Sequence, residues 1–396
     1  MLPSFYQTCL EAHLTSAQYL TLQLLIILLQ TERNVKLERL ATLFPQPIQF
    51  ESRRRNLQRF LGLPQLSVKL LWFPLVKYLV REQFHPHKMN RKRRRYLKRI
   101  KQRGYLLLVI DRTQWKERNL MMVSLVCGRR AIPVYWHLLG KKGNSNLGQQ
   151  KALLTPVLKL LKPNPVIVIG DREYHSVKLA EWLTHKGVDF ALRQKRSTHI
   201  QENGQDYQAL KNLDFKPGMA QFFEGINCTQ KHQLGRFNIA LRWRRKYRGK
   251  GISEPWYILT SLNSLSLTLF CYQARWGIEG MFKDCKTGGY NLEQTKVNDT
   301  RFIALVLLIA IAYSLATFLG QALKYKGVRQ YICRLKELKR YSERHSNFWI
   351  GLYGKLWVGA MEIWSDLALN LMAQKPQKRW FYCQGMRAAS LIQSTV

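Results

Sequence analysis

Residues 165–173 read PVIVIGDRE, and residues 105–112 read YLLLVIDR. Each stretch is an apolar run long enough for a buried strand, and each run ends at an aspartate, Asp171 or Asp111, that is followed at once by arginine. An acid at the carboxyl end of a buried parallel strand lies at the rim of the sheet, where α/β folds place their chemistry. A single such aspartate more often starts a turn or caps a helix. The pair therefore predicts an α/β core and marks a candidate site at one sheet edge.

The sequence on either side of these stretches fits the same core. Apolar runs predict further strands at residues 120–127 and 131–139, and helical spacing predicts helices at residues 147–161 and 177–186. Helical spacing then disappears, and short apolar strands alternate with turns rich in Gly, Asn and Lys. We expect these strands at residues 189–192, 218–223, 236–243 and 256–260. The whole pattern predicts an α/β core with an all-β insertion.

Both ends of the chain read as helical. Apolar periodicity predicts helices near residues 20–29, 37–43, 50–61 and 66–80. A proline-containing break separates the second helix from the third, which carries several arginines, and this pair suits a DNA-binding helix-turn-helix and an ordinary helical hairpin equally well. Residues 88–103 hold ten basic residues and no acid, which predicts a linker that contacts the DNA backbone. Residues 326–396 are basic, helical and interspersed with aromatic residues.

Composition indicates a polyanionic partner. The 396-residue chain has 64 Lys and Arg against 24 Asp and Glu, a formal net charge of +40, and its 46% hydrophobic content is that of a folded protein. Nucleic acid is the leading partner because its phosphates attract a basic protein irrespective of sequence, and a membrane surface is the competitor. Residues 20–29 are too short to span a bilayer, and residues 302–319 suit a helix buried in protein at least as well as a membrane span.

Two further features bear on the compartment. The seven cysteines are odd in number and form no CxxC pair, so reduced thiols in a cytoplasmic protein are the simplest explanation. No signal peptide is recognisable before the first apolar run. We therefore expect a cytoplasmic protein that does not act at a membrane.

Residues 272–286, YQARWGIEGMFKDCK, contain a third acid. On one continuous helix, Tyr272, Arg275, Glu279 and Lys286 would share a face within an arc of about 60°. A carboxylate flanked by two cations and a hydroxyl suits metal-assisted phosphate chemistry, because the acid ligates a hard cation while its neighbours hold phosphate oxygens. Taken alone, the segment is better explained as a solvated helix face with salt bridges at helical spacing, such as Arg275 to Glu279.

Asp111, Asp171 and Glu279 shift that balance when they are taken together. Three carboxylates can hold two divalent metal ions about 4 Å apart, one activating a water or a 3′-hydroxyl and the other stabilising the leaving oxygen of an in-line phosphoryl transfer. This is the arrangement of nucleases and strand-transfer enzymes. We therefore expect the helix face that carries Glu279 to lie against the sheet edge that carries both aspartates.

The order of these acids resembles that of the RNase H-like DDE transposases, which have two strand-end aspartates, a long β insertion and then a glutamate. The spacing Tyr272-x2-Arg275-x3-Glu279-x6-Lys286 matches the YREK signature of bacterial cut-and-paste transposases of the insertion-sequence-four type. The resemblance covers roughly residues 100–325, and its motif is specific because four residues recur at fixed gaps.

The resemblance implies a role for each of these residues. The catalytic and metal-binding residues would be Asp111, Asp171 and Glu279, with two Mg²⁺ ions that Mn²⁺ could replace. Phosphates near the transposon end would be held by Tyr272, Arg275 and Lys286.

The resemblance also implies DNA contacts outside the signature. Residues 256–261, WYILTS, look like the strand whose tryptophan stacks on a flipped base in relatives that excise through a DNA hairpin, although the gap to the signature is shorter here. Packing in the β core explains Trp256 about equally well. Arg172 and Glu173 resemble residues that assist at the site in these enzymes. A phosphate groove or a solvated basic hairpin would account for the arginine-rich residues 242–248, which include Arg244, Arg245 and Arg248.

These expectations divide the chain into a helical DNA-binding region with a basic linker (residues 1–103), an RNase H-like catalytic core in two parts (104–187 and 263–325), an all-β insertion (188–262) and a basic helical C-terminal region (326–396). The implied function is metal-dependent cut-and-paste transposition by a homodimer on double-stranded DNA, at transposon ends and target, in the bacterial cytoplasm with the nucleoid. End cleavage would proceed through a hairpin or by sequential hydrolysis. The alternatives are a catalytically silent DNA-binding protein derived from such an enzyme, which the three acids argue against, and a basic membrane-associated protein.

Overall fold

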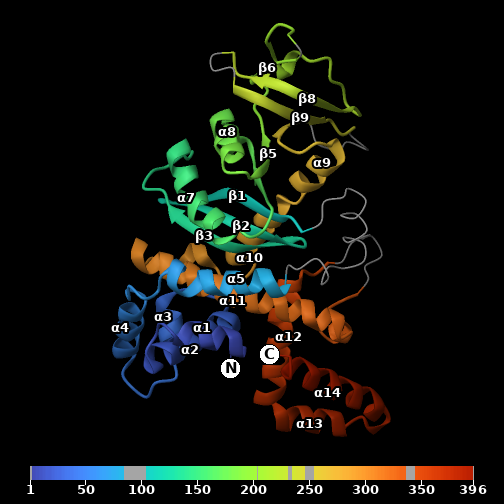
Figure 1. Cartoon of the computed structure of the whole chain (residues 1–396). Coiled ribbons are helices and arrows are strands. Elements are labelled where there is room, and N and C mark those ends of the chain that lie inside the picture. The colour runs from blue at the N-terminus through green and yellow to red at the C-terminus, as the bar shows by residue number, and fades with distance from the viewer. Residues whose placement is uncertain are drawn as a thin grey trace. The chain divides into compact units, whose positions relative to one another are not determined.

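The computed structural model describes residues 2–83, 104–202, 204–230, 234–245, 254–335 and 344–395 (Figure 1). These residues form two compact units. One unit combines Met1–Leu75 with Phe282–Val396 and is helical, and the other, Val76–Met281, contains the β-sheet. The basic linker expected at residues 88–103 lies outside the described residues, so its contact with DNA stays a prediction.

The N-terminal helices lie where apolar periodicity predicts them, except the first, Ser4–Glu11, where no helix was expected. They are α1 (Ser4–Glu11), α2 (Ser16–Glu32), α3 (Leu37–Leu43), α4 (Phe50–Phe60) and the π-helix η1 (Val68–Trp72), which continues into α5 (Phe73–Gln83). Arg53 of α4 donates hydrogen bonds to the carbonyl oxygens of Ala41, Gln46 and Ile48, at 2.9, 3.3 and 3.0 Å. This arginine therefore fastens the turn between α3 and α4, which favours the helical hairpin over a groove-reading role for Arg53.

The C-terminal part of the helical unit is built on one long apolar helix, α11 (Asp299–Tyr325). Its length and composition would allow a membrane span, but 78% of its apolar window is buried inside the protein, as in a core helix. α11 crosses α12 (Asn347–Ile363) at Gly320 and Gly351, where an added Cβ would collide with the backbone of the facing helix. The remaining elements are η5 (Leu292–Gln294), η6 (Val328–Tyr331), α13 (Ser365–Ala373), η7 (Pro376–Lys378) and α14 (Arg379–Gln393). All seven cysteines are free thiols.

The second unit contains one mixed sheet, which has ten strands in the described residues. The strands are β1 (Leu106–Trp115), β2 (Arg118–Cys127), β3 (Arg130–Leu138), β4 (Val166–Gly170), β5 (Asp189–Arg193), β6 (His199–Gln201), β7 (Gln208–Ala209), β8 (Ala220–Cys228), β9 (Leu234–Arg242) and β10 (Trp256–Thr260). Their order is β3-β2-β1-β4-β5-β10-β9-β8-β6-β7. β1, β4 and β5 run parallel, while β2 and β3 extend one side as antiparallel neighbours. This arrangement confirms the predicted mixed α/β fold of the RNase H-like type.

The predicted insertion, residues 188–262, contains strands and the short 3-10 helix η4 (Leu210–Asn212), with no α-helix in the part that the structure describes. β5 pairs with β4 on one side and with β10 on the other. The chain therefore leaves the centre of the sheet after β5 and re-enters it at β10, and β6 to β9 extend the same sheet. The boundaries of the five predicted parts stay a prediction.

Four α-helices accompany the sheet in the described residues. α7 (Leu147–Leu160) contacts β2 and β3, and α8 (Val177–His185) and α9 (Leu265–Gln273) both contact β5 (Figure 1). α10 (Trp276–Cys285) follows α9 after a turn. A Cβ on Gly277 would lie 2.8 Å from the carbonyl oxygen of Arg130, and a Cβ on Gly280 would lie 2.8 Å from the Arg130 guanidinium. The two glycines therefore let α10 approach the β2–β3 hairpin closely.

Candidate active site

Asp111 and Asp171 follow one register pair of the sheet. The parallel pairing of β1 and β4 ends at Ile110 and Gly170, so the two aspartates take the next position on neighbouring strands, which lie about 4.8 Å apart. Asp111 does not end its strand, contrary to the sequence-based expectation, because β1 continues to Trp115 through its pairing with β2. Only the parallel pairing ends there, since the chain leaves β4 after Gly170.

The turn after β4 orients Asp171. A Cβ on Gly170 would lie 2.7 Å from Cβ of Tyr174, so glycine lets the fully buried Tyr174 fold back onto the strand. The intervening residues form the 3-10 helix η3 (Arg172–Tyr174), and Asp171 caps it by accepting a hydrogen bond from the backbone N–H of Glu173 at 2.8 Å. The backbone therefore holds the Asp171 carboxylate in place.

The pKa of the Asp111 carboxyl is affected by both other acids. Burial, the neighbouring Asp171 carboxylate and, to a smaller extent, Glu279 raise the pKa of Asp111 to about 7. The backbone N–H of Arg112, which donates to Asp111 Oδ1 at 2.7 Å, and the Arg275 guanidinium act in the opposite direction. The three predicted acids therefore share one electrostatic neighbourhood.

Arg275 bridges two of the three acids. Its Nη1 lies 3.5 Å from Asp111 Oδ2, and its Nη2 lies 2.5 Å from Glu279 Oε1. The salt bridge expected between Arg275 and Glu279 is therefore present. The Arg275 side chain is only 11% exposed, and its Nε is buried without a hydrogen-bond partner in the part of the chain that the structure describes. A cation so enclosed offsets the repulsion between Asp111 and Glu279.

Residues 272–286 do not form one continuous helix, so the expectation of a single four-residue face is wrong. α9 ends at Gln273, a turn follows, and α10 begins at Trp276. Tyr272 belongs to the last turn of α9, and Glu279 belongs to the first turn of α10. Lys286 lies in the helical unit, where its Nζ is 2.8 Å from Glu293 Oε1. Arg275 therefore reaches Asp111 from a turn and not from a helix face.

Tyr272 and Trp256 pack together in the sheet unit. Burial raises the pKa of Tyr272, so its hydroxyl stays protonated and can donate a hydrogen bond. The Trp256 ring meets the Tyr272 ring edge-on with centroids 5.0 Å apart, and Trp256 is 4% exposed. In this structure Trp256 is a core residue. Stacking on a flipped base would require it to become exposed, and that role stays a prediction.

The donor set of the site suits a hard divalent cation, because all three candidate ligands are carboxylates. A cation bound there would also favour the ionised form of Asp111, whose pKa is raised by burial and by its acidic neighbours. Within the described residues, no three Asp, Glu, His or Cys side chains converge closely enough to hold a metal ion. The positive charge between Asp111 and Glu279 is supplied by Arg275 instead.

Comparison with known families decides the class of the protein. Residues 102–315, more than half of the chain, match the family model described as the transposase DDE domain, and the matched region contains Asp111, Asp171 and Glu279. This chain belongs to the transposase DDE domain family. Membership implies DNA phosphoryl transfer, and members generally use divalent metal ions.

A comparison with solved structures finds a weaker similarity to this DDE transposase chain. The cryo-EM structure of a piggyBac transposase synaptic complex with hairpin DNA matches over 65% of this chain and 53% of that one, at 13% sequence identity and a TM-score of 0.36. The chain thus spans about half the length of the piggyBac chain. A comparison with curated proteins gives no match.

In the DDE domain, an ion pair between Arg112 and Glu173 links the backbone next to Asp111 with the turn that follows Asp171. Arg112 Nε lies 2.9 Å from Glu173 Oε2 in a largely buried ion pair, and Ser145 donates to Glu173 Oε1 through its N–H at 2.9 Å and its hydroxyl at 2.8 Å. Glu173, expected to assist at the site, therefore has a structural partner. Arg172 is 48% exposed, and its Nη1 lies 3.0 Å from Glu254 Oε2.

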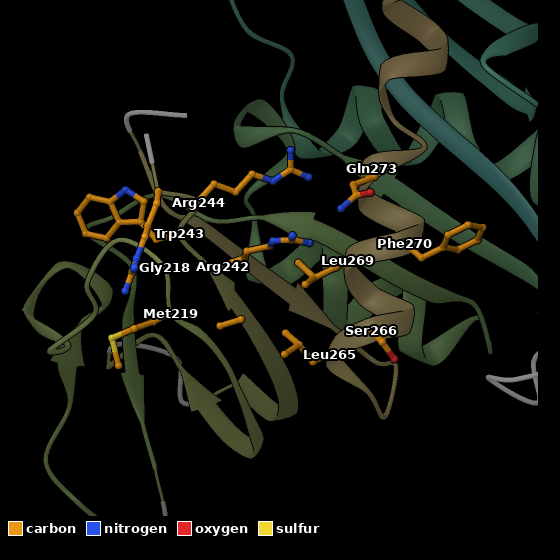
Figure 2. Close-up of a pocket in the computed structure, with 12 residues that line it drawn as sticks. Gly218, Met219, Arg242, Trp243, Arg244, Leu265, Ser266, Leu269, Phe270 and Gln273 are labelled. Atoms are coloured by element: carbon orange, nitrogen blue, oxygen red, sulfur yellow. The ribbon is translucent and has the colours of Figure 1, made fainter. Parts of the chain in front are cut away.

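The arginine-rich stretch of the DDE domain lines a basic pocket of about 830 Å³ (Figure 2). Arg242, Arg244 and Arg245 lie on its β-sheet side, and apolar Leu265 and Leu269 of α9 lie on the other. The two arginines Arg242 and Arg244 point toward α9 in Figure 2. This placement supports a phosphate groove over a freely solvated hairpin. Arg248 lies outside the described residues, so its role stays a prediction.

Gln273 holds two arginines of this pocket in place. With its amide oxygen and nitrogen exchanged relative to Figure 2, Gln273 accepts hydrogen bonds from Arg242 Nη1 and Arg244 Nη2, both at 3.2 Å. The Arg244 guanidinium also lies 5.5 Å from the centroid of the Trp256 ring. The pocket is therefore connected through Trp256 to Tyr272.

Trp276 is a candidate that sequence reasoning passed over. It directly follows Arg275, is 54% exposed, and lies with its ring centroid 5.0 Å from the Arg275 guanidinium carbon. An exposed aromatic ring beside the acids can stack on a nucleotide base. The available signal was the Arg-Trp dipeptide inside the signature, since Trp276 lies three residues before Glu279 and so neighbours it on a helix surface.

Proposed function

We propose that this chain is the transposase of a bacterial insertion sequence of the insertion-sequence-four type, and that Asp111, Asp171 and Glu279 are its catalytic acids. One observation carries the proposal: burial, the Asp171 carboxylate and, to a smaller extent, Glu279 raise the pKa of Asp111 in the DDE domain to about 7, and Arg275 contacts Asp111 and Glu279. Acids gathered against their mutual repulsion are typical of catalytic sites.

The proposed reaction is cleavage of the transposon ends followed by joining of their 3′-ends to target DNA. Two Mg²⁺ ions held by the three carboxylates would activate the attacking oxygen and stabilise the leaving oxygen. The residues of the chain hold the DNA. Arg275 and the protonated Tyr272 hydroxyl donate hydrogen bonds to phosphate oxygens near the cleaved bond, with Lys286 as a third contact.

The proposed partners follow from charge and from the symmetry of the reaction. The formal net charge of +40 and the basic pocket favour DNA as the partner. Arg172, Arg244, Arg245 and Arg248 contact its phosphates. Two transposon ends must be cut together, so the working form is a homodimer on DNA in the bacterial cytoplasm.

The proposed route of excision passes through a DNA hairpin. A hairpin bends the strand sharply, and stacking of an extruded base on an aromatic ring offsets the cost of unstacking. Trp256 becomes available for this only if it leaves its packing against Tyr272, whereas Trp276 is already exposed. Direct detection of the product separates the hairpin from sequential hydrolysis.

The test uses the purified full chain and a plasmid that carries its coding region with flanking genomic DNA on both sides, because the ends of an insertion sequence flank its transposase gene. We expect double-strand breaks at both ends in Mg²⁺ and none in EDTA, with a hairpin seen on a denaturing gel as a strand of doubled length. Site-specific binding without any cutting would contradict the proposal and support a catalytically silent DNA-binding protein.

A further inference from the structure

A second basic pocket lies beside the η3 turn that follows Asp171. Its volume is about 760 Å³, and its lining includes Lys178 of α8, Lys195 after β5, and His175 and His199. Among the described residues that line it, none is acidic. We call it the His175 pocket. A cavity lined by two ammonium groups and no carboxylate is suited to an anion.

The two lysines of the His175 pocket are not neutralised by an acid among the described residues that line it. Burial and the Lys195 ammonium lower the pKa of His175, whose Nδ1 lies 2.8 Å from the Arg172 carbonyl oxygen. Lys178 and Lys195 are exposed, and neither forms an ion pair within the part of the chain that the structure describes. Their charge is therefore available to a ligand.

The polar lining of the pocket suits phosphate in particular. Ser197 and Thr198 add hydroxyl groups, and Oγ1 of Thr229 is buried without a hydrogen-bond partner in the described residues. A hydroxyl can donate to a phosphate oxygen while the ammonium groups balance its charge. These are the contacts that proteins make with a nucleic-acid backbone.

The pocket lies a short distance along the chain from the acids. Asp171 and His175 flank the three-residue 3-10 helix η3 and are four positions apart, and this conformation rises by about 2 Å per residue, so the separation along the helix is about 8 Å. Phosphates of one DNA strand follow one another every 3.4 Å or so along the helix axis. The spacing corresponds to about two to three nucleotides.

We propose that the His175 pocket binds backbone phosphates of the DNA strand about two to three nucleotides from the phosphate held at Asp171. The inference rests on the proposed function, because it takes the DNA position from the catalytic acids. It adds a second backbone contact on the η3 side of the acids, apart from the arginine pocket of β9.

The test compares two double variants that remove the same charge. Lys178→Gln with Lys195→Gln removes the lysines of the His175 pocket, and Lys159→Gln with Lys162→Gln removes exposed lysines at the end of α7. Affinity for a short DNA duplex is measured by fluorescence anisotropy at several salt concentrations. Each lysine that neutralises a phosphate adds about 0.9 to the slope of log affinity against log salt.

We expect the pocket variant to lose about 1.8 from that slope, so that between about 50 and 200 mM salt the native chain weakens about tenfold more than the variant. The α7 variant should keep the native slope, and both variants should melt at the native temperature because their lysines are exposed. Equal slopes for the two variants would overturn the proposal.

A second measurement locates the contact. Single methylphosphonates remove one phosphate charge at a time, and we expect those about two to three nucleotides from the cleavage point to weaken binding by the native chain but not by the pocket variant. Equal sensitivity of both proteins at every position would also overturn the proposal. The salt slopes do not depend on cleavage, so a chain that binds but never cuts would sink the proposed function and leave this inference to be decided separately.

Discussion

Asp111 has its raised pKa because the fold removes it from water and places it beside another acid. In the unfolded chain its pKa would be near the ordinary value of 3.8, whereas in the folded chain it is about 7. Between these values the folded state binds a proton that the unfolded state has lost, so stability falls as pH rises from about 4 to 7. The site therefore destabilises the metal-free protein at neutral and alkaline pH.

The first prediction concerns this pH dependence. Asp111→Asn keeps the shape of the side chain but cannot ionise, so it should be more stable than the native chain at pH 8 in EDTA. Its advantage should grow by about 2 kcal/mol between pH 5 and pH 8. Urea unfolding at the two pH values measures it. An advantage that does not change with pH would show that Asp111 titrates normally in the folded chain.

The second prediction concerns metal at the same residue. A divalent cation that binds the folded site stabilises it by mass action, by about 2.7 kcal/mol at a hundredfold excess over the dissociation constant. Mn²⁺ should therefore raise the melting temperature of the native chain at pH 8 and leave that of Asp111→Asn nearly unchanged. Glu181→Gln, on α8 outside the site, should respond as the native chain does. An equal response of all three would exclude the three-acid site as the binding position.

At the level of elements, the strands were easier to predict than the signature helix. The apolar run of residues 165–170 predicts β4 to within one residue, because a strand buried on both faces has no polar positions. β1 runs past its apolar stretch to Trp115, since pairing with β2 continues where the residues become polar. Sequence pattern could not show that continuation.

The break between α9 and α10 was not predictable from spacing. Gln273, Ala274 and Arg275 are all good helix formers, so local propensity favours one uninterrupted helix. The turn places Arg275 between Asp111 and Glu279, and the close contact of Gly277 with Arg130 fixes the start of α10. The contacts of Arg275 with Asp111 and of Gly277 with Arg130 join residues more than a hundred positions apart in the sequence. Tertiary packing here overrides propensity.

The third prediction tests this placement of α10. Gly277→Ala adds a Cβ that would lie 2.8 Å from the Arg130 carbonyl oxygen, so α10 must shift and carry Glu279 with it. We expect a loss of about 1 to 3 kcal/mol in stability and a marked fall in cleavage. Gly359→Ala in α12 meets no atom within 4 Å and should be neutral or stabilising by up to about 1 kcal/mol. Equal stability of the two variants would contradict the packing of α10 on the hairpin.

At the level of the whole molecule, charge is the dominant property that the sequence predicts. A formal net charge of +40 repels itself in the folded state, and partners or salt that screen it should stabilise the fold. The fourth prediction is that the melting temperature rises as NaCl is increased from about 20 to 200 mM. Over this range the Debye length shortens to below about 10 Å, so repulsion between like charges is screened. An unchanged melting temperature would indicate that self-repulsion is negligible.

The assembly of the site was predictable only in outline. Apolar runs ending at Asp111 and Asp171 indicated a shared sheet edge, and the register pair Ile110 and Gly170 bears this out. The burial of Trp256 and the bridging position of Arg275 depend on packing between distant segments, which residue spacing does not encode. The resemblance supplied the identity of the acids, and the structure supplied their surroundings.

The most direct measurement is cleavage of the plasmid substrate in Mg²⁺ by Asp111→Asn, Asp171→Asn and Glu279→Gln, each beside the native chain and Glu181→Gln. Residues that act as one catalytic unit are not additive, so each single variant should lose about a thousandfold or more in rate, and the triple variant should be little worse. Binding of the same DNA should be kept. Native-like cutting by any of the three, with Glu181→Gln also active, would contradict a site built from Asp111, Asp171 and Glu279.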